Sequence, residues 1–208
     1  MQVKAAGKDI VRAGRRLGAR GLVSAGEGNL SIRLDGSRIL VSPSGRRKDE
    51  LGPDDMVVVQ LDSRGAEARS RSGLAPTSDV AIHLAIYDAR PDVEAIIHAH
   101  LPASMGLTLA GEVPDPAALP ETALFLPRLP YLSLGVPGSA ELAGRIAGAL
   151  TEPPVPLPGA VLLERHGAVA VGAGLDQALD RLELVEVLCR AWRDALLIRA
   201  ALATLRTL

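Results

Sequence analysis

The feature that most limits the fold of this chain is an alternation between turn-linked strand patterns and helix patterns. Apolar residues alternate at Leu30, Ile32 and Leu34, and the turn sequence D-G-S at 35–37 leads directly into a second apolar run at 38–45. This arrangement predicts a β-hairpin. Further strands are predicted at 56–63 and 93–100, with a strand, turn and strand over 159–174; helices are predicted at 3–20, 80–89, 138–150 and 175–205, the last as one helix or a pair.

Helices that interleave with hairpin-linked strands must cover both faces of one sheet. The predicted fold class is therefore α/β, a three-layer α/β/α sandwich around a largely antiparallel or mixed sheet. The whole chain, 1–208, is expected to form one domain. The Pro- and Gly-rich stretch 111–138 predicts loops around short strands. Thr77 or Ser78 is expected to cap the helix at 80–89, and Ser139 the helix that follows it.

Composition narrows the class of partner. Aromatic residues make up only 2% of the chain, so stacking platforms for single-stranded nucleic acid are scarce. The net charge is −1 and no basic stripe stands out, which disfavours nucleic acid and anionic membranes. No apolar run approaches the roughly 18–20 residues of a membrane span, and the N-terminus lacks a signal-peptide apolar stretch. The one cysteine, Cys189, cannot form an internal disulfide, so we expect a soluble, cytoplasmic protein.

The sequence I-I-H-A-H at 96–100 sets two histidines at the end of an apolar run. Residues i and i+2 of a strand point to the same face, so His98 and His100 can bind one cation or be two polar residues at a strand end. His166 lies in a turn between two strand-like runs, and Asp79 heads the helix that leads into the His98 strand. Three imidazoles with an open position are typical of a catalytic zinc site, in which a carboxylate is a further ligand or a base. His83 is expected to pack or to form hydrogen bonds.

Four stretches, in order, resemble the class II aldolase/adducin family: G-L-V-S-A-G-E-G-N-L-S-I-R-L, the run from I-L-V-S-P-S-G to Q-L-D, the run from P-T-S-D to H-A-H-L-P-A-S, and L-L-E-R-H-G-A-V-A-V-G with the helix start after it. The resemblance spans about residues 8 to 190. It implies an α/β/α sandwich that assembles as a C4 homotetramer with active sites at subunit interfaces. It also implies a divalent metal, usually Zn²⁺ and sometimes another ion such as Mn²⁺.

The resemblance carries site residues over one by one. The metal ligands fall on His98, His100 and His166, and the family's acidic residue falls on Asp79. The phosphate-binding groups fall on three loops: Gly28 and Asn29, Ser44 and Gly45, and Thr77 and Ser78. Backbone N–H groups and a helix start at such loops can bind a phosphate.

The activity implied is that of a metal-dependent aldolase, a carbon–carbon lyase. It would act on a small sugar phosphate or hydroxy-ketone through a metal-stabilised enediolate. A sugar-phosphate 4-epimerase, a dehydratase or a decarboxylase would use the same metal site. A further alternative is a non-catalytic interaction module of the adducin type, but a scaffold has no need of the three histidines.

Two loop positions depart from the aldolase pattern. Glu27 stands where the phosphate-binding aldolases carry a small or hydroxyl residue, and Gly26 replaces a threonine. A carboxylate there would repel a phosphate dianion unless it points away, and Arg46, Arg47 and Lys48 can offset its charge or be solvated. The bound group can therefore be a phosphate, a carboxylate or an uncharged group.

The proton-transfer partners also match neither well-known branch of the family. Asp79 is shorter than the glutamate of the aldolase branch and matches the aspartate of the epimerase branch. No segment in 111–135 resembles the second acid/base motif of the epimerases. Tyr131 falls where the family commonly has a structural aromatic residue, and the alternative is that it serves as the catalytic tyrosine of the aldolases. Asp115 and Glu121 lie in the variable loop, where they can serve a neighbouring subunit.

Overall fold

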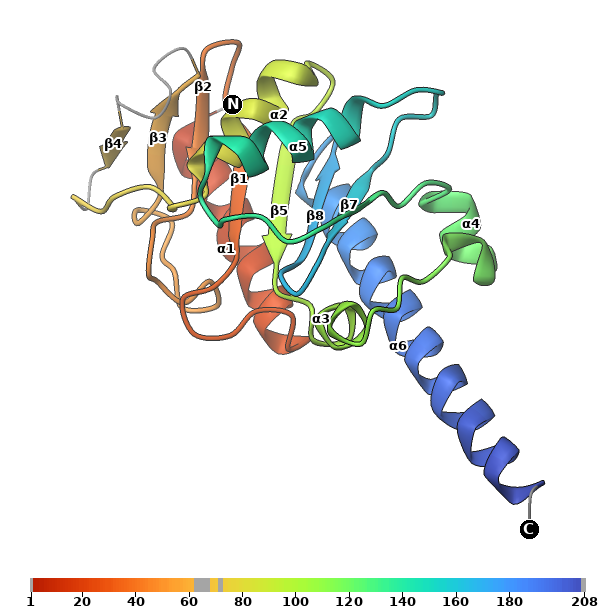
Figure 1. The fold of residues 1–208 in the computed structure, drawn as a ribbon. Helices are drawn as coiled ribbons and strands as arrows, with labels where there is room; N and C mark the ends of the chain where they lie inside the picture. Colours follow the sequence, from red (N-terminus) through yellow and green to blue (C-terminus); the bar gives the residue numbers. More distant parts are fainter. Residues whose placement is uncertain (1, 62–67, 71–72, 207–208) are drawn as a thin grey trace.

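The computed structural model, which describes residues 2–61, 68–70 and 73–206, contains one sheet of eight strands (Figure 1). Their order across the sheet is β4-β3-β2-β1-β5-β8-β7-β6, and every neighbouring pair is antiparallel except β6 and β7. The strands are β1 (Asn29–Arg33), β2 (Arg38–Val41), β3 (Val57–Gln60), β4 (Ala68–Ser70), β5 (Ala95–Ala99), β6 (Tyr131–Leu132), β7 (Ala160–Leu163) and β8 (Gly167–Gly172). The predicted hairpin is confirmed as β1 and β2.

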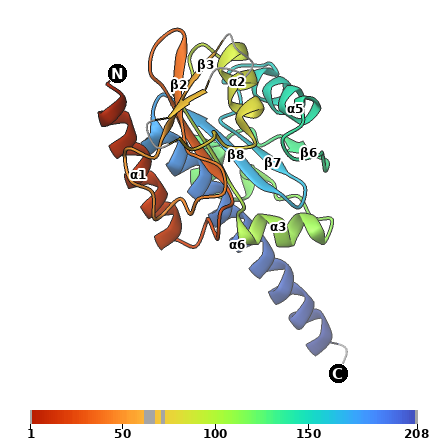
Figure 2. The ribbon, with the colours of Figure 1, turned by 90° about the vertical axis from the view of Figure 1, so that its left-hand side faces the viewer.

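Two helical layers cover the sheet, which confirms the predicted α/β/α sandwich (Figure 2). One layer holds α1 (Val3–Ala19), α3 (Pro102–Leu109) and α6 (Leu175–Leu205); the other holds α2 (Val80–Ala89) and α5 (Ala140–Thr151). The carboxyl-terminal part of α6 extends away from the sandwich as a single helix (Figure 1). Among the described residues, no helix is both long and apolar enough to cross a membrane.

The central strand β5 is buried on both sides, and its alternation determines the place of the site. Ala95, Ile97 and Ala99 face the layer of α1, α3 and α6, whereas Ile96 packs in the opposite core cluster beside α2 and α5. His98 has the same parity as Ile96. The histidine face of β5 is therefore the face covered by α2.

Three local predictions need correction. Neither Thr77 nor Ser78 is the N-cap of α2: the cap is Asp79, and the Thr77 hydroxyl instead accepts a 3.3 Å hydrogen bond from the Asp79 backbone N–H. The stretch predicted as loops and short strands contains, besides β6, the helix α4 (Pro120–Phe125) and the 3-10 turn η1 (Pro116–Ala118). The sequence patterns also gave no sign of α3. Its first turn is stabilised from outside, because the buried Glu186 carboxylate on α6 accepts a hydrogen bond from Ala103 N–H.

Other predictions agree with the structure. Ser139 caps α5, since its hydroxyl accepts a hydrogen bond from Leu142 N–H at 3.1 Å. The predicted strand at 56–63 is present as β3, and residues 62 and 63 lie outside the described part of the chain.

Candidate metal centre and adjoining cavity

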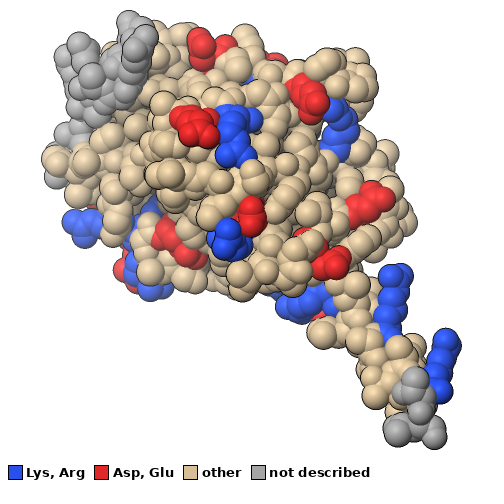
Figure 3. Space-filling view, in the orientation of Figure 1, with Lys and Arg blue, Asp and Glu red and all other residues tan. Residues whose placement is uncertain are grey.

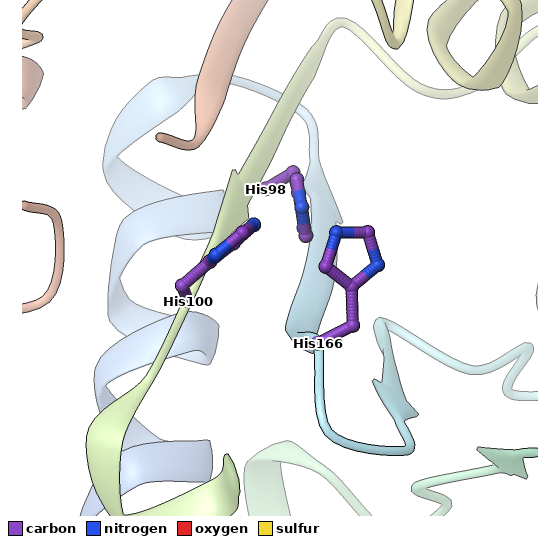
Figure 4. A group of neighbouring side chains, drawn as sticks. All are labelled: His98, His100 and His166. Carbon is purple, nitrogen blue, oxygen red and sulfur yellow. The ribbon is translucent and has the colours of Figure 1, made fainter. Parts of the chain in front are cut away.

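The three histidines singled out in the sequence meet at one end of the sheet (Figure 4). His98 lies near the end of β5, His100 follows that strand, and His166 lies in the turn between β7 and β8. Their ring centroids are 4.7 to 5.0 Å apart. One ring nitrogen from each lies within 4.8 Å of the others, which is close enough for all three to bind one ion.

Two glycines allow the backbone segments of the site to approach one another. Gly167 has a φ of +94°, and a Cβ there would lie 2.1 Å from the carbonyl oxygen of Ala99 and 2.8 Å from the Cα of His100. Gly28 has a φ of +70°, and its Cβ would lie 2.8 Å from the carbonyl oxygen of His98. Any side chain at either position would push the loop away from the histidines.

Hydrogen bonding determines which nitrogen of His98 is available. Its Nδ1 lies 3.0 Å from the backbone carbonyl of Ala168, and a carbonyl can only accept, so Nδ1 carries the proton. The Nε2 atom therefore has a free lone pair, and it is fully buried with no hydrogen-bond partner in the part of the chain that the structure describes. A buried polar atom without a partner is costly unless something binds it. Metal coordination by Nε2 would remove that cost.

Burial and the neighbouring imidazoles favour the neutral forms of His98 and His166. Burial, reinforced by the neighbouring His166 and His100, holds the pKa of His98 well below its usual range. Burial and His100 likewise lower the pKa of His166, against the opposing effect of Asp79. Neutral imidazoles are the form that binds Zn²⁺ and similar divalent ions. The donor set therefore fits the metal that the resemblance implied.

Asp79 is joined to the core by a chain of buried hydrogen bonds. Asn29, which pairs with His98 across β1 and β5, donates through Nδ2 to Asp79 Oδ2 at 2.9 Å. Asn29 Oδ1 then contacts His83 Nε2 at 2.7 Å, and His83 Nδ1 contacts the hydroxyl of Ser31 at 2.7 Å. Ser31 in turn meets the hydroxyl of Tyr87 at 2.9 Å.

The donor and acceptor roles along this series of hydrogen bonds follow from its end at Asp79. An ionised carboxylate only accepts, so Asn29 presents its amide to Asp79 and its carbonyl oxygen to His83. His83 must then donate from Nε2 and accept at Nδ1. Burial lowers the pKa of His83 to about 3, which keeps its ring neutral as this pattern requires. His83 therefore forms hydrogen bonds, as expected, and helps to fix Asn29 against the carboxylate of Asp79.

A cavity of about 310 Å³ lies beside the histidines and is lined by nearly all of the residues that the resemblance implied. It brings together His100, His166, Asp79, Gly28, Asn29, Ser44, Gly45, Thr77 and Ser78, with Gly26, Glu27, Lys48 and Pro137. Of the predicted site residues, only His98 is not part of the lining, because it lies fully buried behind it.

Lys48 is a cavity residue whose place could not be read from the sequence, because three consecutive basic residues look alike. Arg46 and Arg47 are exposed, whereas Lys48 is only 2% exposed. Its ammonium donates to the carbonyl oxygens of Gly26 at 2.8 Å and Arg46 at 2.6 Å. Burial lowers the pKa of Lys48 to about 8, opposed by Glu27 and Asp79, so the group remains mostly charged at neutral pH.

The residues considered as alternative proton-transfer groups lie elsewhere in the described structure. Asp115 caps the turn η1 by accepting a hydrogen bond from Ala117 N–H. Glu121 lines a separate surface cavity beside α6. Tyr131, on β6, is not among the residues that line the cavity beside the histidines, and burial and the nearby Glu164 raise its pKa.

Comparison with known proteins agrees with this geometry. The family model of the class II aldolase and adducin N-terminal domain matches residues 8–193. A methylthioribulose-1-phosphate dehydratase of Gluconacetobacter diazotrophicus is 33% identical over 87% of this chain and 89% of its own. A 3-oxo-tetronate 4-phosphate decarboxylase of Haemophilus influenzae is 32% identical over 85% of this chain and 81% of its own.

Solved structures lead to the same family. The crystal structure of L-fuculose-1-phosphate aldolase from Thermus thermophilus superimposes with a TM-score of 0.79 at 27% identity, covering 96% of this chain and 98% of that one. Relatives of this chain thus include an aldolase, a dehydratase and a decarboxylase on one fold. The family model covers most of the 208 residues, and the chain belongs to the class II aldolase and adducin N-terminal domain family.

Proposed function

We propose that this protein is a divalent-metal-dependent lyase that acts on a small sugar phosphate. The observation that carries the proposal is the buried Nε2 of His98, which has no hydrogen-bond partner among the described residues and lies beside the imidazoles of His100 and His166 at the edge of a polar cavity. His98, His100 and His166 would hold the ion, with Zn²⁺ as the first candidate and Mn²⁺ as the second. An interaction module has no use for such a group, because a buried imidazole nitrogen without a ligand only lowers stability.

The metal would supply Lewis acidity that stabilises negative charge on the carbonyl and hydroxyl oxygens of the substrate. Asp79 would move the proton. Its Oδ2 is held by Asn29, and the carboxylate lines the cavity beside His100 and His166. A carboxylate fixed in this way can take the proton from the hydroxyl on the carbon β to the carbonyl during carbon–carbon cleavage, and can then return it to the carbon next to the carbonyl.

The far wall of the cavity would bind the phosphate. Gly28 and Gly45 line the cavity and would offer backbone N–H groups, and Thr77 and Ser78 lie directly before the start of α2, where the positive end of the helix favours an anion. Lys48 uses two of its three N–H donors on backbone carbonyls and has a third for an anion. Its charge offsets one of the two carboxylates, Glu27 and Asp79, that share the cavity.

Carbon–carbon cleavage, as in the aldolase relatives, is the leading reaction. Dehydration or decarboxylation is the second candidate, favoured by relatives above 30% identity that carry those names, among them the dehydratase and the decarboxylase described above. All three reactions begin with charge developing next to a carbonyl, which is the step that the histidine cluster and Asp79 would support.

A substrate panel tests the proposal. The purified protein is loaded with Zn²⁺ or Mn²⁺ and incubated with L-fuculose 1-phosphate, methylthioribulose 1-phosphate, a 3-oxo-tetronate 4-phosphate and the phosphate-free forms of each. Release of aldehyde, water-elimination product or CO₂ identifies the reaction. Turnover is expected only for phosphorylated compounds and only with metal. Turnover of the phosphate-free forms alone would contradict the phosphate site, and failure to bind metal would contradict the enzyme assignment.

We further propose that the protein is a homo-oligomer, with the family's tetramer as the expected state. The projecting end of α6 exposes Leu197, Ile198, Leu202 and Leu205, and this part of the helix stands clear of the body (Figure 3). Apolar side chains on a free-standing helix end favour association. Multi-angle light scattering is expected to give a mass near four chains, and a Leu197→Glu/Ile198→Glu variant is expected to dissociate. A wild-type mass of one chain would contradict this assembly.

A further inference from the structure

We propose that Glu27, which at first sight disfavours an anionic substrate, is a positioning residue that orients His100 for metal binding. This inference rests on the proposed metal site. Glu27 Oε2 lies 3.1 Å from Nδ1 of His100. A carboxylate accepts, so this contact places the His100 proton on Nδ1 and leaves the Nε2 lone pair for the ion. The same division of roles occurs at His98, where the backbone carbonyl of Ala168 holds Nδ1.

The loop that carries Glu27 is built to deliver the carboxylate to this place. Glu27 Oε1 accepts a hydrogen bond from Ser24 N–H at 2.7 Å, and Glu27 N–H donates back to the Ser24 carbonyl at 3.1 Å. Ala25, between them, has a φ of +46°, a left-handed conformation that a residue with a Cβ adopts only under constraint. Both carboxylate oxygens of Glu27 thus have partners, one in its own turn and one on His100.

Lys48 also holds the loop that carries Glu27. Its buried ammonium donates to the carbonyl oxygen of Gly26, the residue directly before Glu27. The cation also balances the charge of the carboxylate next to it. A buried lysine and a turn hydrogen bond therefore hold Glu27 from two sides, and the carboxylate is not free to turn toward a phosphate.

A carboxylate behind a ligating imidazole does two things. It fixes the tautomer and the angle of the ring, and it makes the ring a stronger electron donor. Glu27 and His100 are each about one quarter exposed, at 27% and 24% of their side-chain surface, so solvent weakens but does not remove the effect. Loss of such an outer partner weakens metal binding by roughly 10–100-fold.

The test measures the affinity of Zn²⁺ alone, by competition with a chromophoric chelator, without any substrate. Zn²⁺ binding to the Glu27→Ala protein is expected to be about 10–100-fold weaker than in the wild type. Glu27→Gln keeps an acceptor for His100 but loses the charge, and it is expected to fall between the two. Glu50→Gln is the matched control: it also removes a negative charge, but from an exposed glutamate paired with Arg47, and its affinity should change by less than about twofold.

Nitrogen-15 NMR of the zinc-loaded, histidine-labelled protein supplies a second readout. A slowly exchanging Nδ1 proton on His100 is expected in the wild type and in Glu27→Gln, and it should be lost to solvent in Glu27→Ala. Wild-type affinity in a folded Glu27→Ala protein would overturn this inference alone. Absence of Zn²⁺ binding by the wild type would overturn both this inference and the proposed function.

Discussion

Replacing His98 by Asn is expected to abolish stoichiometric metal binding while the fold survives. An Asn side chain can present its amide N–H where His98 Nδ1 now donates to Ala168, so the 3.0 Å bond across β5 and β8 has a replacement. The buried Nε2 lone pair is lost. Zinc binding at a full site is worth about 10–16 kcal/mol, so one ligand of three accounts for roughly 3 kcal/mol or more, a loss of at least about 100-fold in affinity.

Turnover of the best panel substrate should fall by about 10³-fold in the same variant, because several kcal/mol of charge stabilisation leave with the ion. Elemental analysis of the purified proteins checks the metal: about one equivalent in the wild type and none in His98→Asn. His83→Gln is the control for metal content alone, because His83 lies outside the cluster but holds Asn29, so turnover is not compared in this variant. Zinc should also raise the melting temperature of the wild type but not of His98→Asn. Full metal content in a folded His98→Asn protein would refute the site.

Replacing Asp79 by Asn should lower kcat by about 10²–10⁴-fold with little change in metal content. The range is that of removing a general acid or base. The new amide could still offer a carbonyl oxygen to Asn29 Nδ2, now 2.9 Å from Asp79 Oδ2, so the buried hydrogen-bond chain to His83 would be kept. What disappears is the ability to take up a proton.

The control for this variant lies on the same helix. Asp88→Asn removes an equal charge from the exposed side of α2 and should leave kcat within about twofold of the wild type. Loss of zinc together with activity in Asp79→Asn would show that Asp79 is a metal ligand and not the base. Retention of wild-type kcat would remove it from the chemistry altogether.

Local sequence patterns were sufficient to predict the main helices and strands and to pair two of the three histidines of the metal site. Period-two alternation predicted that His98 and His100 point the same way, and the structure brings their rings to a centroid distance of 5.0 Å. Periodicity acts within a few residues, and the amphipathic helix α1 agrees with it. It does not report contacts with distant residues, so α3, whose first turn is held by Glu186 some 83 residues later, was missed.

Further site residues could be assigned one by one only through the family resemblance. His166 lies beside His100 because β5 and β8 pair antiparallel with His98 opposite Val169, a register that no local signal reports. The burial of Lys48 and the turn of Glu27 toward His100 also depend on where the loops before β1 and after β2 meet. These contacts decide whether a charge faces the solvent, a ligand or a metal-binding ring.

The sequence by itself determined the layered α/β fold, the shared face of His98 and His100, and the types of residue available for a metal and an anion. Only the tertiary structure decided that the His98 Nε2 atom has no partner among the described residues, that His83 and Asn29 hold Asp79, and that Glu27 Oε2 lies 3.1 Å from His100 Nδ1. The physical reason is that the residue type alone determines which functional group a side chain carries. Its protonation, direction and partners are set by groups that the fold brings from elsewhere in the chain.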